Sequence, residues 1–220
     1  MSQPFDLVIF DCDGVLVDSE VISCRVHAEV LTRHGYPISV EQVFDRFLGR
    51  SARQANVEIE AELGRSLPDD FHAHLRDHLF QSFATTLEMI PHVDQALAAI
   101  MRPVCVASSG SQERMRVTLG RAGLYDIFAP HIFSASQVEH GKPAPDLFLF
   151  AAAQMAASPE RCLVIEDSVA GIAGALAAGM TVFGFHGGSH CRPGYGETLR
   201  AAGAALTFDD MRQLPRLVQD

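Results

Sequence analysis

Short apolar runs that end in polar residues recur along the chain. The first covers residues 7–10 (Leu-Val-Ile-Phe) and is followed by Asp11, and comparable runs cover residues 104–107, 163–165 and 182–185. Each run is short, bounded by polar residues and apolar at nearly every position. This pattern is typical of a parallel strand that is buried on both faces of a sheet.

Helix-like sequence follows the later runs, over residues 111–122, 169–178 and, after a Gly-rich loop, 197–202. Strands that alternate with helices indicate a doubly wound parallel sheet with right-handed crossovers. In such sheets the functional groups gather at the carboxyl ends of the strands. We therefore predict an α/β fold with its chemistry at that edge.

The pattern changes between residues 17 and 86, where no apolar strand run occurs. Glycines separate several helical stretches there, which cover residues 20–34, 40–47, 52–63 and 68–83. Helices inserted directly after a first strand, and tethered at two points, have the organisation of a lid. We expect an all-helical cap domain of residues 17–86 on a core domain of residues 1–16 and 87–220.

The composition excludes some classes of function. The chain has 220 residues, of which 48% are hydrophobic, so it can bury a substantial core and is not disordered. Its formal net charge of -10 argues against nucleic acid as a partner, because such surfaces need clustered Lys and Arg. An acidic protein that handles an anionic substrate needs a locally positive pocket, which indicates a metal ion and a few fixed cations.

The cysteines and the first residues bear on location. The five cysteines lie far apart without a C-x-x-C pair, and Cys105 and Cys162 lie in apolar runs, where cysteine acts as a small hydrophobe. The apolar run before Asp11 is too short for a secretory signal, and no stretch reaches membrane-spanning length. We expect a cytoplasmic protein with reduced thiols and no membrane partner, present as a monomer or a weak homodimer.

The first predicted strand leads into Asp11-Cys12-Asp13-Gly14. Side chains two apart on an extended chain share one side, and Gly14 permits a sharp turn. A calcium loop is excluded because Val15 occupies the next ligand position and the glycine comes too early. A solvated turn is disfavoured by the apolar run before it. Buried carboxylates need a cation, and a hard metal ion is a fitting partner.

A second acidic pair, Glu166-Asp167, follows another predicted strand. It either caps the helix that begins near Val169 or joins Asp11 and Asp13 in an oxygen-rich pocket that suits Mg²⁺.

Ser108 and Ser109 follow the second predicted strand and leave two interpretations open. They either cap the helix that starts at Ser111, or they present a hydroxyl and a backbone N–H to a phosphate group at the helix N-terminus.

Lys142 is the only lysine among the 17 Lys and Arg residues. An ammonium is a compact point charge that a guanidinium does not replace at a tight anion site. Lys142 is therefore either part of an anion site or a surface lysine left over by a composition bias.

Four segments resemble the haloacid dehalogenase-like phosphohydrolases, in the branch with a helical cap after the first strand. They occur in family order over the whole chain, and Lys142 lies in the third. The segments are residues 10–19 (Phe-Asp-Cys-Asp-Gly-Val-Leu-Val-Asp-Ser), 106–110 (Val-Ala-Ser-Ser-Gly), 141–146 (Gly-Lys-Pro-Ala-Pro-Asp) and 164–168 (Val-Ile-Glu-Asp-Ser).

The resemblance implies a role for each acidic residue. Asp11 is the expected nucleophile, and Asp13 is the general acid toward the leaving group and the base toward water. Mg²⁺ is expected on the Asp11 carboxylate, the backbone carbonyl of Asp13 and Asp167, with Glu166 a direct or water-mediated ligand. Hydrolysis then proceeds through an aspartyl-phosphate. Lys142 joins the metal in neutralising the phosphoryl oxygens.

The resemblance implies that Ser108 also contacts the phosphoryl group, and it separates this chain from some relatives. The dehalogenases themselves lack an aspartate at the position of Asp13, and the phosphonate-cleaving branch needs a cap lysine that residues 17–86 do not contain. We therefore expect hydrolysis of phosphate monoesters.

A β-phosphoglucomutase-like activity is the alternative within this family. Residues 48–53 resemble the cap substrate loop of that branch, but Leu48 replaces its lysine, and its cap histidine is absent, with Ile22 or Ser23 in its place. Simple hydrolysis is therefore preferred over a phosphosugar mutase.

Some features bear on the substrate. Arg50 and Arg53 either grip a carboxylate or second anionic group, or lie on a solvated cap face. Residues 18–22 and 43–47 are similar to bacterial 6-phosphogluconate and sugar-phosphate phosphatases. Residues 186–190 leave a predicted strand at the functional edge and either reach the substrate or form a plain loop. We expect a small phosphorylated metabolite, a sugar or sugar-acid phosphate, as substrate.

Two hypotheses of other classes stay open. A signalling receiver domain also combines an aspartate at a strand end with a Ser or Thr and a Lys, but it accepts a phosphoryl group without turnover. Asp13 and the inserted helices favour turnover. A non-catalytic scaffold is the other hypothesis, and it predicts that Asp11→Asn changes no activity.

Overall fold

The computed structural model describes residues 5–47 and 52–219, with the backbone alone for residues 52–54. The chain divides into two compact units. The core unit comprises Met1–Asp18 and Glu88–Asp220, and the helical unit comprises Ser19–Leu87. The role of the helical unit as a cap stays a prediction. No helix within the described ranges combines the length and the apolar character needed to cross a bilayer.

The core unit contains a six-stranded parallel sheet with the order β3-β2-β1-β4-β5-β6. The strands are β1 (Leu7–Phe10), β2 (Val104–Ser108), β3 (Ile132–Ser134), β4 (Cys162–Glu166), β5 (Thr181–Phe185) and β6 (Leu206–Phe208). Val8 of β1 lies opposite Val104 on one side and Leu163 on the other. The strand order reverses between β1 and β4, and ligands bind at such a reversal in parallel sheets.

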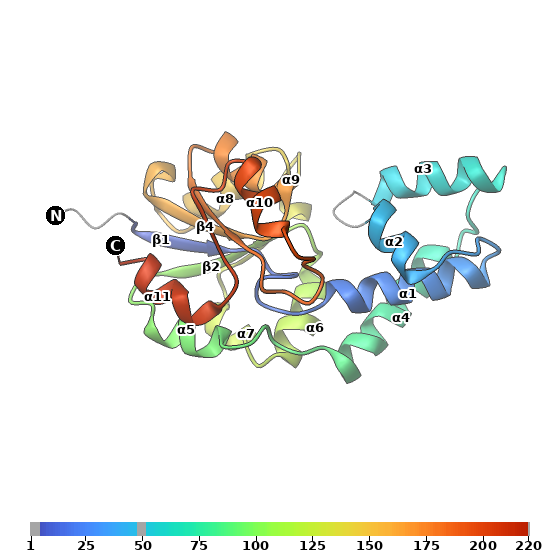
Figure 1. Ribbon diagram of the computed structural model, residues 1–220, viewed down its shortest axis with the longest axis horizontal. Helices are drawn as coiled ribbons and strands as arrows, with labels where there is room; N and C mark the ends of the chain where they lie inside the picture. The colour runs from blue at the N-terminus through green and yellow to red at the C-terminus, as the bar shows by residue number, and fades with distance from the viewer. Residues whose placement is uncertain (1–4, 48–51, 220) are drawn as a thin grey trace. The chain divides into compact units, whose positions relative to one another are not determined.

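Helices cover both faces of this sheet, as Figure 1 shows. On one face lie α8 (Asp146–Gln154), α9 (Val169–Ala177) and α10 (Tyr195–Ala201). On the other lie α5 (Val93–Ala99), α6 (Gln112–Arg121), α7 (Tyr125–Phe128) and α11 (Leu214–Leu217). Short 3₁₀ helices cover Ala135–Gln137, Pro159–Arg161 and Met211–Gln213. The predicted doubly wound α/β core is confirmed.

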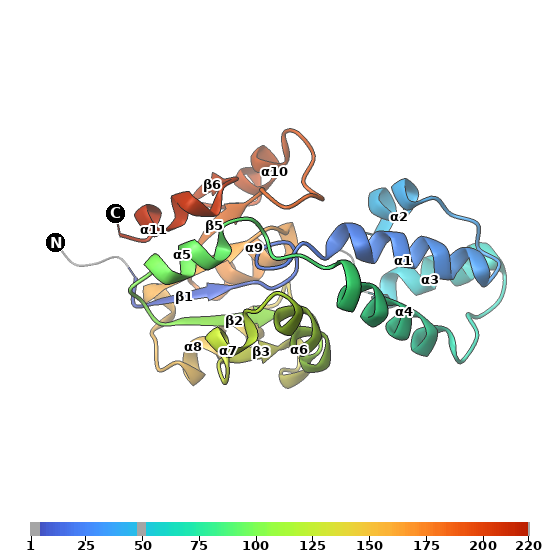
Figure 2. The same cartoon turned by 90° about the horizontal axis from the view of Figure 1, so that it is seen from below.

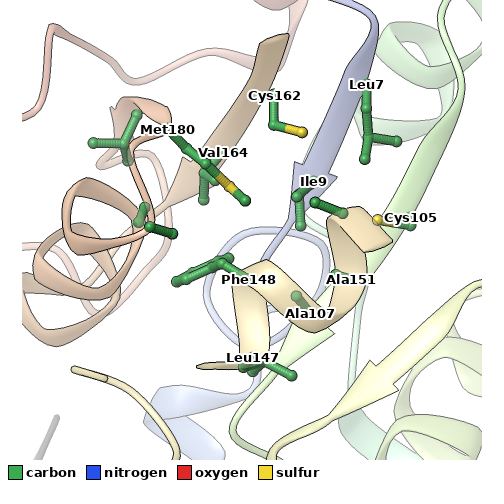
Figure 3. Close-up of a cluster of buried hydrophobic side chains, with 14 of the residues drawn as sticks. Leu7, Ile9, Cys105, Ala107, Leu147, Phe148, Ala151, Cys162, Val164 and Met180 are labelled. Carbon is green, nitrogen blue, oxygen red and sulfur yellow. The ribbon is translucent and has the colours of Figure 1, made fainter. Parts of the chain in front are cut away.

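The core between the sheet and α8 is built from small and large apolar side chains. Figure 3 shows Ile9 of β1 and Val164 of β4 near Phe148 and Ala151 of α8. The alanine lets the helix approach the strands closely, and the phenylalanine fills the space beside it. Cys162 packs here as a small apolar side chain, and burial raises the pKa of its thiol to about 11. This dense layer fixes the strand ends, from which the polar residues project.

The helical unit contains α1 (Glu20–Arg33), α2 (Val40–Phe47), α3 (Ala52–Leu63) and α4 (Phe71–Thr86), which Figure 2 shows from a second direction. α1 packs against α2 and α4, and Val26, Val30 and Leu31 of α1 are buried, as are Phe71 and Phe83 of α4. Arg46 of α2 donates to Glu58 of α3 at 2.7 Å. The structure confirms the predicted bounds of α2 and α3, whereas α1 ends at Arg33 rather than at residue 34, and α4 covers Phe71–Thr86 rather than residues 68–83.

Candidate active site

The carboxylate of Asp11 lies where β1 ends, next to β4. All residues of β1 are buried and apolar, and Asp11 is the first polar side chain after the strand. The backbone N–H of Asp11 donates to the carbonyl of Ile165 at 3.0 Å, which continues the pairing of β1 with β4. Asp11 is 8% exposed. The pairing brings Asp11 beside the residues that follow β4.

Three carboxylates meet at this point of the sheet. Oxygen atoms of Asp11, Glu166 and Asp167 all lie within 4.8 Å of one another, and all three residues are buried. Lys142 joins them: its Nζ lies 2.6 Å from Asp11 Oδ1 and 2.6 Å from Glu166 Oε1. The lysine side chain is 4% exposed, so the interpretation of a leftover surface lysine is wrong.

The charges in this cluster do not balance. Burial raises the pKa of Asp11 well above its usual range, against the opposing charge of Lys142. Burial also raises the pKa of Asp167, although His190 opposes the shift. For Lys142 burial disfavours the charge, but Asp11 and Glu166 outweigh it and raise the pKa of the ammonium. An excess of buried carboxylates over nearby cations favours the binding of a further cation.

The donor set fits a hard divalent ion. The three converging side chains offer only oxygen atoms, and Mg²⁺ prefers a few carboxylates together with water and substrate oxygens. The turn after Asp13 lies against the Asp167 carboxylate. Gly14 has a φ of +80°, and a Cβ there would lie 1.9 Å from Asp167 Oδ2. Only glycine lets the backbone approach this carboxylate so closely.

Asp13 is held from the other side by an arginine. Its side chain is 13% exposed, and its Oδ1 accepts from Arg114 Nη2 at 2.8 Å and from Nε at 3.3 Å. Arg114 lies in the first turn of α6, which Ser111 caps by accepting from the Arg114 backbone N–H at 3.1 Å. Sequence reasoning missed Arg114. The available signal was its place in the first turn of a helix that starts at the functional edge.

The loop after β2 lies beside Asp13. Ser108 is 1% exposed, and its Oγ accepts from the backbone N–H of Gly110 at 3.0 Å. A Cβ on Gly110 would lie 3.3 Å from Ser108 Oγ and 3.5 Å from Asp13 Oδ2. Ser109 is exposed. The interpretation of Ser108 and Ser109 as helix caps is wrong, because Ser111 is the cap of α6.

Glu166 is anchored rather than used as a helix cap. Its Oε2 accepts from the backbone N–H of Ser168 at 2.8 Å and from the Ser168 hydroxyl at 2.9 Å, while its Oε1 accepts from Lys142. Ser168 itself caps α9 by accepting from Gly171 N at 3.0 Å. The interpretation of Glu166-Asp167 as the cap is therefore wrong.

His190 is a further member of the site. Its Nε2 lies 2.9 Å from Asp167 Oδ2, and its side chain is 3% exposed. Sequence reasoning left open whether residues 186–190 form only a loop, and their histidine in fact reaches the carboxylate cluster. Of the arginines expected to bind the substrate, Arg50 lies outside the described residues. Arg53 lies in α3, and its side chain is outside the described part of the structure.

The chain is similar to known hydrolases. A family model described as haloacid dehalogenase-like hydrolase matches residues 5–179. The 6-phosphogluconate phosphatase of Escherichia coli is 33% identical over 213 residues, which are 96% of this chain and 94% of that protein. The fructose-1-phosphate phosphatase YqaB of the same species is 29% identical over 181 residues, 82% of this chain and 96% of that one.

Solved structures show the same similarity. A conserved haloacid dehalogenase-like protein of unknown function from Agrobacterium tumefaciens is 42% identical, with a TM-score of 0.86 and 97% of both chains covered. A hydrolase of the same family from Deinococcus radiodurans, with bound phosphate and sodium, is 34% identical. Its TM-score is 0.79, with 97% of this chain and 94% of that chain covered.

Proposed function

The chain belongs to the haloacid dehalogenase-like hydrolases and is a phosphoric monoester hydrolase, and within that class we propose that it is an Mg²⁺-dependent phosphatase of sugar or sugar-acid phosphates. One observation carries the proposal. The Lys142 ammonium contacts the buried carboxylates of both Asp11 and Glu166, and oxygen atoms of these two residues lie within 4.8 Å of one of Asp167. The proposed nucleophile, a cation and the proposed metal ligands thus lie together at one point of the sheet.

Asp11 and Asp13 divide the reaction between them. In the first displacement an Asp11 carboxylate oxygen forms a bond to phosphorus while the ester P–O bond breaks, and Asp13 gives its proton to the leaving alcohol. In the second, water attacks phosphorus, Asp13 accepts the proton of that water, and the bond between phosphorus and Asp11 breaks. Arg114, 2.8 Å from Asp13, keeps the acid beside the loop after β2.

The attack of one anion on another requires positive charge around both. Lys142 contributes an ammonium 2.6 Å from Asp11 Oδ1, and Ser108 is the proposed contact to a phosphoryl oxygen. The Asp11 carboxylate, the backbone carbonyl of Asp13, Asp167 and Glu166 would hold the metal. When bound, Mg²⁺ supplies the charge that lets the carboxylate approach the phosphate.

A sugar-acid phosphate is the substrate class that we favour. The E. coli relative that matches 96% of this chain is a 6-phosphogluconate phosphatase. A second anionic group on the substrate also gives Arg50 and Arg53 a partner, because guanidinium groups bind carboxylates in a bidentate manner. We propose 6-phosphogluconate as the first compound to test.

The test is phosphate release from a panel of compounds in the presence of Mg²⁺. The panel contains 6-phosphogluconate, phosphorylated sugars, phosphoglycolate and nucleotides. We expect the highest kcat/KM for a sugar or sugar-acid phosphate, and equally poor rates throughout would contradict the substrate proposal. Release of no more than one equivalent would indicate a phosphoacceptor domain. Conversion of a sugar phosphate to its isomer without free phosphate would indicate a mutase.

Two substitutions at opposite ends of β1 test the role of the nucleophile. Asp11→Asn should abolish turnover, whereas Asp6→Asn should leave it unchanged. Asp6 lies just before the strand and makes an exposed ion pair with Arg161. The control variant thus has the same chemical change next to the same strand. Turnover by Asp11→Asn at the wild-type rate would refute the assignment.

A further inference from the structure

The loop that follows β5 has no role in the mechanism so far. Gly184 of β5 pairs with Glu166 of β4, so this loop leaves the sheet beside the residue that precedes Asp167. The loop then brings His190 back to the site, with Nε2 at 2.9 Å from Asp167 Oδ2. Both side chains are buried, at 3% and 7% exposure. A buried contact of this length is a strong hydrogen bond, because water does not compete for it.

The surroundings hold the imidazole ring in one place. The ring of Tyr195 packs edge-on against it at 6.3 Å between ring centres, and a Cβ on Gly14 would lie 2.8 Å from His190 Cε1. His190 Nδ1 is buried and has no hydrogen-bond partner among the described residues. Asp167 and, at 3.4 Å from Nε2, the Cys191 sulfur are therefore the polar contacts that orient the ring.

Ser189, the residue before His190, has contacts of its own. Ser189 donates to Asp18 Oδ1 from its backbone N–H at 3.2 Å and from its hydroxyl at 2.8 Å. The Ser189 side chain therefore helps to hold the loop in place, whereas the His190 side chain contacts the metal-binding carboxylate of Asp167. Separate substitutions of Ser189 and His190 can distinguish loss of the loop position from loss of the contact to Asp167.

His190 is not itself placed to bind the ion. The group of described side chains that could hold a metal contains Asp11, Glu166 and Asp167, but not His190. Of these three carboxylates, His190 contacts only that of Asp167. His190 is therefore placed as a hydrogen-bond partner of a metal ligand, and such partners fix the orientation of the ligand.

We propose that His190 is a positioning residue, which holds Asp167 Oδ2 so that the carboxylate faces Asp11 and Glu166 and binds Mg²⁺ tightly. This inference rests on the metal site of the proposed function but not on the identity of the substrate. Without the imidazole the Asp167 carboxylate can rotate, and the free-energy cost of ordering it then weakens binding of the ion. Loss of such a partner lowers metal affinity about 10–100-fold.

The test is calorimetric titration of the metal-stripped, full-length protein with MgCl₂. His190→Ala should raise the Kd for Mg²⁺ by about 10–100-fold. His190→Gln retains an N–H donor that reaches the same carboxylate oxygen, so it should restore most of the affinity. Ser189→Ala is the matched control, which loses the hydroxyl contact to Asp18 and should bind Mg²⁺ like the wild type. At saturating Mg²⁺ the kcat of His190→Ala should return toward that of the wild type.

Other outcomes would overturn the proposal. These are a wild-type Kd for His190→Ala, an equal loss of affinity in Ser189→Ala, or no recovery in His190→Gln. If His190→Ala does not fold, judged by circular dichroism, the Kd of the glutamine variant decides, and a loss of more than about tenfold refutes the proposal. Calorimetry does not depend on turnover. A wild-type protein that binds Mg²⁺ but hydrolyses no compound would refute the phosphatase function and leave this test intact.

Discussion

Replacement of Lys142 by methionine should destabilise the fold far more than the loss of a surface ion pair. Methionine has a similar length and no charge, so it leaves the carboxylates of Asp11 and Glu166 facing each other without the ammonium that lies 2.6 Å from both. The lysine side chain is 4% exposed, and the carboxylate side chains are 11% and 0% exposed. Water therefore cannot replace the lost contacts.

The burial of these groups sets the size of the effect. Removal of one partner from a buried ion pair costs about 3–5 kcal/mol, because the remaining charge stays desolvated. The matched control is Arg161→Met, which breaks a bidentate contact to Asp6 with both atom pairs at 2.7 Å. Those side chains are 35% and 56% exposed, and exposed pairs contribute little because water solvates either partner.

The assay is urea denaturation in EDTA, which gives the free energy of unfolding without bound metal. We expect a loss of about 3–5 kcal/mol for Lys142→Met and a small fraction of that for Arg161→Met. Equal losses in the two variants would refute the argument that burial decides the effect. So would a Lys142→Met protein as stable as the wild type.

The loss in Lys142→Met should also shrink as the pH falls. Burial already raises the pKa of Asp11 well above its usual range, and removal of Lys142 takes away the main opposing charge. The folded variant then binds a proton that the unfolded chain has released, so acid favours its folded state. Denaturation of both proteins between about pH 8 and about pH 5 measures the difference. A loss that grows toward low pH would contradict this account.

Three further predictions concern single groups of the core unit. Asp13→Asn should lower kcat/KM for a sugar phosphate about 10²–10⁴-fold but lower kcat/KM much less for an aryl phosphate, because the aryl leaving group needs no proton in the first displacement. Equal losses of kcat/KM for the two substrates would contradict the acid role. Gly14→Ala should weaken Mg²⁺ binding in calorimetry, because its Cβ would lie 1.9 Å from Asp167 Oδ2, and an unchanged Kd would contradict the close approach. A thiol reagent should label Cys191 first in the native protein, because Cys191 is half-buried and the other cysteines are buried. Rapid labelling of more than one thiol would contradict the burial of Cys12, Cys24, Cys105 and Cys162.

The sequence predicts the central strands well because their interior positions are nearly all apolar. β1 and β4 are buried along their whole length, and their one polar residue, Glu166, lies at the end of β4. β3 and β6 were not predicted. Each has three residues at an edge of the sheet, and β6 is only partly buried, so neither produces a run long enough to recognise.

The site divides in the same way. The sequence predicts that Asp11, Glu166 and Asp167 meet because they follow predicted strands, and parallel strands bring their ends together. The structure brings the three carboxylates together. Arg114 was missed because it reaches Asp13 from the first turn of a helix, across 101 residues of sequence. The role of His190 was left open because an irregular loop carries it to Asp167. Contacts of this kind depend on the path of loops and on helix packing, which no local pattern specifies.

Trapping of the covalent intermediate is the most direct test of the nucleophile. The protein is mixed with Mg²⁺ and 6-phosphogluconate, quenched during turnover and treated with borohydride, which reduces an acyl phosphate to the alcohol. Peptide mass spectrometry should then find homoserine in place of Asp11, and only when both metal and substrate are present. Homoserine in place of Asp13 instead, or turnover with no reduced residue at position 11, would contradict an aspartyl-phosphate on Asp11.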